Sequence, residues 1–237
     1  MKLLAIESSA VTASVAIMTE DILTAEYTIN YKKTHSQTLL PMIDEICKMT
    51  ETDVNTIDYY AVSVGPGSFT GLRIGAATGK GMALATGKDM VAVPTLEALA
   101  YNLYGTDKLV CSIMDAKRRH LYCGMYTFDE AGNLKRVKNQ CLISYEELAD
   151  MLNEMAVPVF FVGDGIAAAG DMLKESLKVK AFFAPAHMNT QRAASVAMAA
   201  ISRINQGDVV SADALRPDYL RPSQAERELS EKMKNNE

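Results

Sequence analysis

A carboxylate and two hydroxyls follow the first apolar segment of the chain, in the sequence Glu7-Ser8-Ser9, and Thr12 comes shortly after them. Hydroxyls and backbone amides at such a turn could hold a phosphate, and the Glu7 carboxylate could hold a water molecule bound to a metal ion. The same residue types also occur in ordinary turns, where neighbouring amides satisfy the carboxylate. Nucleotide binding would therefore require a second phosphate-binding loop elsewhere in the chain.

The candidate for that second loop is Gly163-Asp164-Gly165, which lies between a predicted strand and a predicted helix in the second half of the chain. This turn has the topological position in the second half of the chain that corresponds to Glu7-Ser8-Ser9 in the first half. The two turns could grip a nucleotide only if they faced one another across two lobes. A tight strand-to-helix turn explains the same three residues without a ligand.

The segment from Val64 to Gly75, VGPGSFTGLRIG, predicts a strand, a glycine-built turn and a helix. Gly65 and Gly67 allow positive φ angles in the turn, and Ser68 is well placed to cap a helix that begins at Phe69. The free amides at such a helix start can bind an anion, although most helix starts bind only water. Both interpretations stay open at this point.

Inside that helix, small residues recur every four positions at Gly71, Gly75, Gly79 and Ala83 and form a ridge along one side. Each interior glycine costs about 1 kcal/mol relative to alanine, so the ridge needs a compensating gain. Bare backbone lets a second helix approach closely, which predicts a docking face for a partner. In the alternative, the ridge packs only within its own lobe. The apolar residues expected to flank the contact are Leu72, Ile74 and Met82.

Several common catalytic and metal-binding patterns are absent from the sequence. The Gly-Lys pairs lack the spacing of a phosphate-binding P-loop, and the histidines are too widely separated to form a His-x-x-x-His pair. No His and acidic pair is recognisable that could activate Ser68 as a nucleophile. The four cysteines form no Cys-x-x-Cys pair, so neither a zinc site nor a disulfide framework is indicated.

The net charge of −5 argues against the chain gripping a nucleic-acid backbone alone. One basic cluster, Lys117 to His120, lies at a predicted hairpin turn and is either a solvated loop or a phosphate clamp. No apolar run approaches the ~18 residues that span a bilayer, and the N-terminus lacks a secretory signal. We therefore expect a cytoplasmic protein without membrane contact.

The elements that must position these residues follow from the hydrophobic pattern. The first half predicts three strands in a meander and then alternating helices and strands, which together form a layered α/β lobe. The predicted strands are 3–6, 13–18, 22–30, 59–64 and 90–93, and the predicted helices are 36–47, 69–86 and 95–104.

After residue 107 the pattern partly restarts, which predicts a second, smaller lobe. Ser144 and Glu147 form a capping box that opens a helix. The predicted strands are 109–114, 121–128, 157–162 and 181–183, and the predicted helices are 144–154, 165–177 and 190–205. The expected divisions are an N-terminal lobe at 1–105, a C-terminal lobe at 106–222 with a late helix that could return to the first lobe, and a charged tail at 223–237.

Segments spread over nearly the whole chain carry a family resemblance. They are LLAIESSAVTASVAI, HSQTLLPMID, VGPGSFTGLRIG, VPTLEALA, FVGDG and DYLRP. Together they resemble the bacterial TsaB family, historically named YeaZ, and VGPGSFTGLRIG is highly specific. The resemblance implies an α/β, actin-like and sugar-kinase-like ATPase fold of two ribonuclease-H-like lobes. It also implies a role in making threonylcarbamoyladenosine beside the anticodon of tRNA.

In that family the related subunit TsaD performs the transfer, and the ATPase TsaE joins the pair. TsaD-like transferases carry VNHLEGHL where this chain has VPTLEALA, so the two metal-binding histidines fall at Thr95 and Leu99. Neither residue could replace them as a ligand set, so the resemblance implies a non-catalytic subunit without an intrinsic metal or cofactor. ATP or ADP could still bind at the interface of the complex. Glu7 stands where the family more often has Asp.

The resemblance further implies that pairing uses the first two helices, either with a TsaD-like transferase or, in the free chain, with a second copy. tRNA would be contacted only through the complex. Met42 and Met82 could adapt the packing to either partner. The residues expected at this interface are His35, Leu39, Met42, Ile43, Gly71, Leu72, Ile74, Gly75, Gly79, Met82 and Ala83.

Two other functions compete with the scaffold role. The first is an ATPase or phosphotransferase that uses the two turns described above, with the nucleotide residues Glu7, Ser8, Ser9, Thr12, Gly163, Asp164 and Gly165. The second is a glycoprotease-like peptidase, for which no catalytic residues are visible in the sequence.

Overall fold

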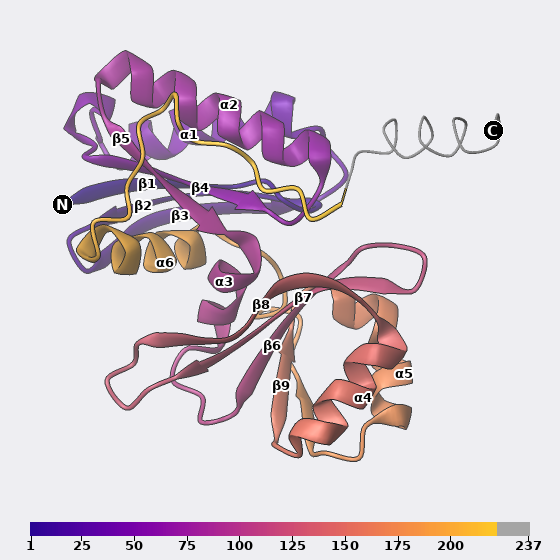
Figure 1. Cartoon of the computed structure of the whole chain (residues 1–237). Coiled ribbons are helices and arrows are strands. Elements are labelled where there is room, and N and C mark those ends of the chain that lie inside the picture. Colours follow the sequence, from indigo (N-terminus) through magenta and orange to yellow (C-terminus); the bar gives the residue numbers. More distant parts are fainter. Residues whose placement is uncertain (222–237) are drawn as a thin grey trace.

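The computed structural model describes residues 1–221, which form two lobes, each built on a five-stranded sheet (Figure 1). The strand order of the first sheet is β3-β2-β1-β4-β5. Strand β2 is antiparallel to β1 and β3, whereas β4 is parallel to both β1 and β5. The strands are β1 (Lys2–Glu7), β2 (Thr12–Thr19), β3 (Ile22–Asn30), β4 (Tyr59–Gly65) and β5 (Asp89–Pro94).

The second sheet repeats the connectivity of the first, in the order β10-β9-β6-β7-β8. Again three strands form an antiparallel meander and two more add in parallel on the side of the first strand. The expected actin-like ATPase fold of two ribonuclease-H-like lobes is confirmed. The strands are β6 (Leu109–Asp115), β7 (His120–Phe128), β8 (Leu134–Ser144), β9 (Val159–Val162) and β10 (Ala181–Phe183).

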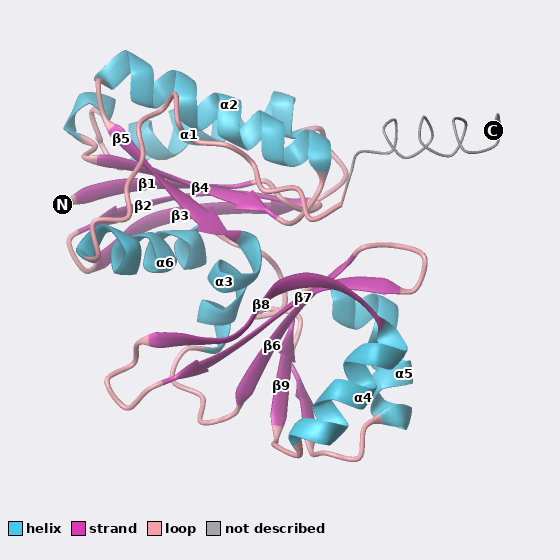
Figure 2. Cartoon of the chain, viewed as in Figure 1, coloured by secondary structure: helices cyan, strands magenta, loops and turns pink. Residues whose placement is uncertain are grey.

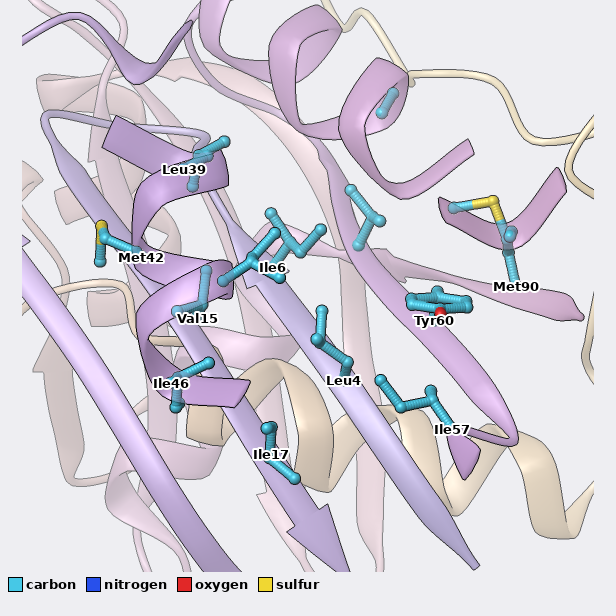
Figure 3. Packing of buried hydrophobic residues seen from close by; sticks show 14 of the residues in the cluster. Leu4, Ile6, Val15, Ile17, Leu39, Met42, Ile46, Ile57, Tyr60 and Met90 are labelled. Atoms are coloured by element: carbon cyan, nitrogen blue, oxygen red, sulfur yellow. The ribbon is translucent and has the colours of Figure 1, made fainter. Parts of the chain in front are cut away.

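The central strands of the first sheet are buried on both faces, because helices cover both sides. Helices α1 and α2 lie on one face and α6 on the other (Figure 1). Figure 3 shows Leu39, Met42 and Ile46 of α1 packed over Ile6 and Val15 of the sheet. The helices are α1 (His35–Met49), α2 (Phe69–Thr86) and α6 (Ala193–Asn205).

The second lobe has its own core, in which Leu152 and Leu173 pack around the fully buried Phe161 of β9. These leucines come from α4 (Tyr145–Met155) and α5 (Gly165–Ser176), which cover one face of the second sheet. Helix α3 (Thr95–Ala100) covers the opposite face through Leu96 and Leu99. Since every residue of α3 is buried, this helix joins the two lobes as part of the core.

The sequence-based prediction misses one strand, β8, which forms an edge of the second sheet (Figure 2). Its sequence, LKRVKNQCLIS, carries charges without a clear alternation, and most of its residues are not fully buried. Lysines suit an exposed edge strand, but they remove the periodic signal. The helix predicted at 95–104 is also shorter, because it changes to a 3₁₀ turn at Tyr101–Leu103. The other predicted elements are found with small shifts at their ends.

The predicted charged tail at 223–237 lies outside the described residues, and the predicted lobe boundaries stay a prediction. Helix α6 packs on the first sheet although it follows the second sheet in sequence. No helix in the part of the chain that the structure describes is long and apolar enough to cross a membrane.

Candidate functional site

Helix α2 begins and ends where the sequence predicts. The Ser68 hydroxyl accepts a hydrogen bond from the Gly71 amide at 3.2 Å and caps the first turn. At the other end, Gly87 adopts a left-handed conformation with φ of 66°, and its amide donates to the Ala83 carbonyl. Between these caps, α2 runs along the face of the first sheet that is opposite α6 (Figure 1).

The glycine ridge of α2 faces the chain's own sheet. A Cβ atom at Gly71 would lie 2.1 Å from the Ser8 carbonyl oxygen, and one at Gly75 would lie 2.2 Å from the Ser8 hydroxyl oxygen. A Cβ atom at Gly79 would lie 2.6 Å from a methyl group of Val62. The ridge thus lets α2 approach β1 and β4, and the expectation that it is open to a partner helix is wrong.

Most of the other residues expected at the interface face inward too. Leu39, Met42 and Ile43 of α1 belong to the core beneath the helices, and Leu72 and Ala83 of α2 are buried as well. The remaining three are partly buried, namely His35, Ile74 and Met82. The His35 ring donates through Nε2 to the Ala10 carbonyl at 2.8 Å. The residues that the sequence suggested for an interface therefore lie mostly on the sides of α1 and α2 that pack on the sheet, and an interface on these helices stays a prediction.

The outward surface of α1 and α2 contains exposed leucines and small residues among polar side chains. Leu40 of α1 is 59% exposed and Leu84 of α2 is 61% exposed. Between the turns of α2, Ala77, Gly81 and Ala85 form a second small-residue ridge that is exposed to solvent. A Cβ atom at Gly81 would have nothing within 4 Å. We call these five residues the outer face.

The first turn is folded inward. The Ser9 amide donates to the Glu7 carboxylate at 2.6 Å, and the Ser8 hydroxyl donates to the Gly71 carbonyl at 3.0 Å. Burial raises the pKa of the Glu7 carboxyl, although the hydrogen bonds from Ser9 oppose this shift. Ser8 therefore joins the end of β1 to α2, and the local Ser9 amide satisfies Glu7, as in the ordinary-turn interpretation.

The raised pKa of Glu7 has a consequence for stability. The folded state binds the Glu7 proton more tightly than the unfolded state does. The contribution of Glu7 to the free energy of unfolding therefore falls as pH rises above the ordinary pKa of 4.5. Glu7→Gln keeps an acceptor for the Ser9 amide and removes the titration. We expect the free energy of unfolding of this variant, minus that of the parent, to rise with pH by up to about 1.4 kcal/mol per pH unit.

Chemical denaturation of both proteins between pH 4 and pH 8 measures this difference. Other carboxylates titrate equally in both proteins and cancel in the comparison. A constant difference across the range would mean that Glu7 does not titrate as the buried geometry requires.

The second predicted loop also has a packing role. A Cβ atom at Gly163 would lie 2.0 Å from the Ile113 carbonyl oxygen, and the Gly163 amide donates to the Asn189 side chain at 2.6 Å. Gly165 lies against the same part of β6. The Asp164 carboxyl sits between the lobes, where burial raises its pKa and a hydrogen bond from Gln191 opposes the rise.

A cleft of about 870 Å³ separates the two lobes at the ends of β1 and β6. Ser9 and Asp164 both line it. The structure thus brings one residue of each predicted loop to a common space. The other predicted nucleotide residues do not line it; they are Glu7, Ser8, Thr12, Gly163 and Gly165.

The cleft has a mixed charge. Lys117 at the turn between β6 and β7 forms an ion pair with Asp115 at 2.5 Å. The neighbouring Arg119 is paired with Glu146. Because acidic side chains compensate two of its cations, this turn resembles a solvated loop more than a phosphate clamp. Sequence reasoning missed the cleft residues Asp218 to Arg221, since an irregular segment carries no periodic signal.

The metal site of TsaD-like transferases does not fit this chain. Thr95 and Leu99, at the positions of the two histidines, are buried at 0% and 1% exposure within α3. Among residues 1–221, no group of three or more His, Cys, Asp or Glu side chains is arranged to hold a metal ion.

The chain matches a known family and known proteins over most of its length. The TsaD family, described as tRNA N6-adenosine threonylcarbamoyltransferase, matches residues 23–229. The tRNA threonylcarbamoyladenosine biosynthesis protein TsaB of Bacillus subtilis (strain 168) is 32% identical and covers 99% of this chain and 100% of its own. The protein of the same name from Escherichia coli (strain K12) is 28% identical over 97% of this chain and 98% of its own.

Among solved structures, YeaZ from Pseudomonas aeruginosa superimposes with a TM-score of 0.79 at 26% identity. The superposition covers 92% of this chain and 99% of that protein. Both the sequence and the architecture thus match over nearly the full length of these relatives. The chain belongs to the TsaB family.

Proposed function

We propose that the chain is a non-catalytic subunit of the machinery that makes threonylcarbamoyladenosine in tRNA, and that it binds and supports a TsaD-like transferase. Relatives over its full length are named as proteins of this biosynthesis. The loss of ligand residues at Thr95 and Leu99 favours a supporting role over a catalytic one.

The observation that carries the proposal is the outer face of α1 and α2. An exposed leucine on each helix and a ridge of small residues on α2 suit close packing against apolar helices. The two helices lie side by side on the same face of the first sheet (Figure 1), so both are accessible from one direction. A partner helix pair there would complete a four-helix contact.

Gly81→Arg tests this face. The substitution adds a long charged side chain where the free protein has open space, so the fold should be retained while the helices of a partner are held apart. We expect the affinity for the transferase to fall at least about tenfold, a loss of about 1.4 kcal/mol. Gel filtration and titration calorimetry with the purified transferase measure it.

Met198→Arg is the matched control, because Met198 is 40% exposed on α6, on the opposite side of the same sheet. This control should bind like the parent protein. Unchanged binding by Gly81→Arg, with the fold intact, would remove the outer face from the interface.

The remaining partners in this proposal follow from the family resemblance. A second copy of the chain would occupy the outer face in the absence of the transferase, and a TsaE-like ATPase would join the assembled pair. ATP or ADP would bind at the interface of the complex, and tRNA would be contacted through the complex. The acidic net charge of −5 supports the last point, since it disfavours a hold on RNA by the chain alone.

A further inference from the structure

The last described segment, Arg216 to Arg221, crosses the cleft between the lobes. We call it the interlobe strap. On the first lobe, the Asp218 amide donates to the Val64 carbonyl at 2.7 Å. Gly65 lies directly beneath, with a φ of 126°, and a Cβ atom there would come within 2.2 Å of the Asp218 carbonyl oxygen. Glycine is therefore required for the strap to lie this close to β4.

The strap is also attached to the first turn of α2. The Tyr219 ring packs on Phe69 with 4.7 Å between ring centroids, and the Arg73 guanidinium lies 3.9 Å from the centroid of the Phe69 ring. Arg73 donates through Nε to the Tyr219 hydroxyl at 3.0 Å. These contacts combine ring packing, a cation–π contact and a hydrogen bond at one place.

On the second lobe the attachment is lighter. Gln140 of β8 donates to the Asp218 carboxylate at 2.8 Å and to the Gly65 carbonyl at 3.3 Å. Arg221 donates to the carbonyl of Ala116, at the turn between β6 and β7, at 2.6 Å. Both attachments are side-chain hydrogen bonds, whereas the first lobe holds the strap by backbone, ring and guanidinium contacts.

We propose that the interlobe strap is a latch that sets the opening of the cleft. The unequal attachment determines which end releases: the strap stays on the first lobe, and the bonds of Gln140 and Arg221 break when the lobes separate. Tyr219 and Arg221 form part of the cleft wall, so release also changes access to the space beside Ser9 and Asp164.

The latch also connects the cleft to α2, and this second part rests on the function proposed above. Because Phe69 and Arg73 belong to α2, a partner that fixes α2 would fix the strap at its first-lobe end. Docking would then favour the latched arrangement of the lobes. The first part of the inference does not depend on any partner.

Distances between spin labels in the two lobes test the latch in the free chain. Labels at Asp21→Cys, in the turn after β2, and at Lys178→Cys, after α5, report the lobe separation in a Cys141→Ser background. The double variant Gln140→Leu with Arg221→Met removes the donors of all three of these hydrogen bonds. We expect a broader distance distribution with a new longer component. A distribution identical to that of the parent would overturn the latch.

Arg216→Met is the matched control, because within residues 1–221 the Arg216 side chain donates to the carbonyls of Asp213 and Leu215, which immediately precede the strap, and makes no bond to the second lobe. It should leave the distribution unchanged. Hydrogen exchange at the Asp218 amide separates release from unfolding: protection is retained in the double variant if the strap stays on the first lobe. Loss of that protection would contradict the proposed order of release. If the double variant does not fold, Gln140→Leu alone serves as the test, with the same outcomes.

The transferase tests the connection to α2. Adding it to the double variant should narrow the distance distribution again. If the transferase binds and the distribution stays broad, the connection is wrong while the latch stands. If the transferase does not bind the parent protein at all, the proposed function fails, and the measurements on the free chain still decide the latch.

Discussion

Phe161→Ala is expected to lower the free energy of unfolding by about 3–5 kcal/mol, as large-to-small changes at fully buried aromatic positions do. Phe161 is 0% exposed, and its ring stacks on Phe183 of the neighbouring strand with 5.1 Å between centroids. Leu152 of α4 and Leu173 of α5 belong to the same buried cluster, so filling the cavity would require these helices to move. Denaturation in guanidinium chloride, followed by circular dichroism, measures the loss.

Two further variants check that the loss comes from the cavity. Phe161→Leu keeps most of the volume, so we expect it to lower the free energy of unfolding by only about 1–1.5 kcal/mol. Phe182→Ala removes the same atoms from a partly buried ring on β10 and should also have a small effect. Equal losses for Phe161→Ala and Phe182→Ala would mean that Phe161 is not the centre of the second core. Hydrogen exchange should locate the loss in the second lobe.

Gly71→Ala is expected to lower the free energy of unfolding by about 2–3 kcal/mol, in the range of overpacking in a filled core. The new methyl group would lie 2.1 Å from the Ser8 backbone oxygen, which cannot rotate away as a side chain could. Either α2 or the turn after β1 must shift. The cap by Ser68 and the bond from Ser8 to the Gly71 carbonyl would weaken together.

Gly81→Ala is the matched control, since the same substitution is made in the same helix. Nothing lies within 4 Å of the new methyl group, so only the gain in helix propensity remains. We expect this variant to be more stable than the parent by about 0.5–1 kcal/mol. Chemical denaturation measures the change in free energy of unfolding for both variants, and its sign is the test. Stabilisation by Gly71→Ala would show that the ridge does not pack against the sheet as described.

The sequence was most informative where local physics alone determines structure. The extent of α2 follows from Ser68 and Gly87, because a cap hydroxyl and a left-handed glycine act on the neighbouring turn only. The capping box of Ser144 and Glu147 located α4 for the same reason. Both predictions need no knowledge of the tertiary structure, and the structure confirms them.

The direction in which α2 faces could not be obtained in this way. The ridge of Gly71, Gly75 and Gly79 and the ridge of Ala77, Gly81 and Ala85 both consist of small residues at a spacing of four. Small side chains on two sides give the helix a weak hydrophobic periodicity, so its pattern does not distinguish the core face from the solvent face. Only the approach of Ser8 and Val62 in the folded chain decides between them.

The strap and β8 were missed because their positions depend on distant parts of the chain. Asp218 contacts β4 and Gln140 contacts Asp218, and these partners are widely separated in sequence. Strand β8 is held by backbone pairing with β7, which places few demands on its side chains. For the candidate site, the sequence therefore located the helices and the two turns, while the cleft and its closing segment required the fold.

The position of α6 affects how the protein is made. Its residues Ala193, Val196 and Ala200 cover the face of the first sheet that carries Leu3 and Val91. They are nevertheless synthesised after the strands of the second sheet. Domains usually fold on the ribosome in the order in which they emerge. Here the N-terminal lobe cannot bury that face until α6 has left the exit tunnel, so the lobe that is translated first is the last to be completed.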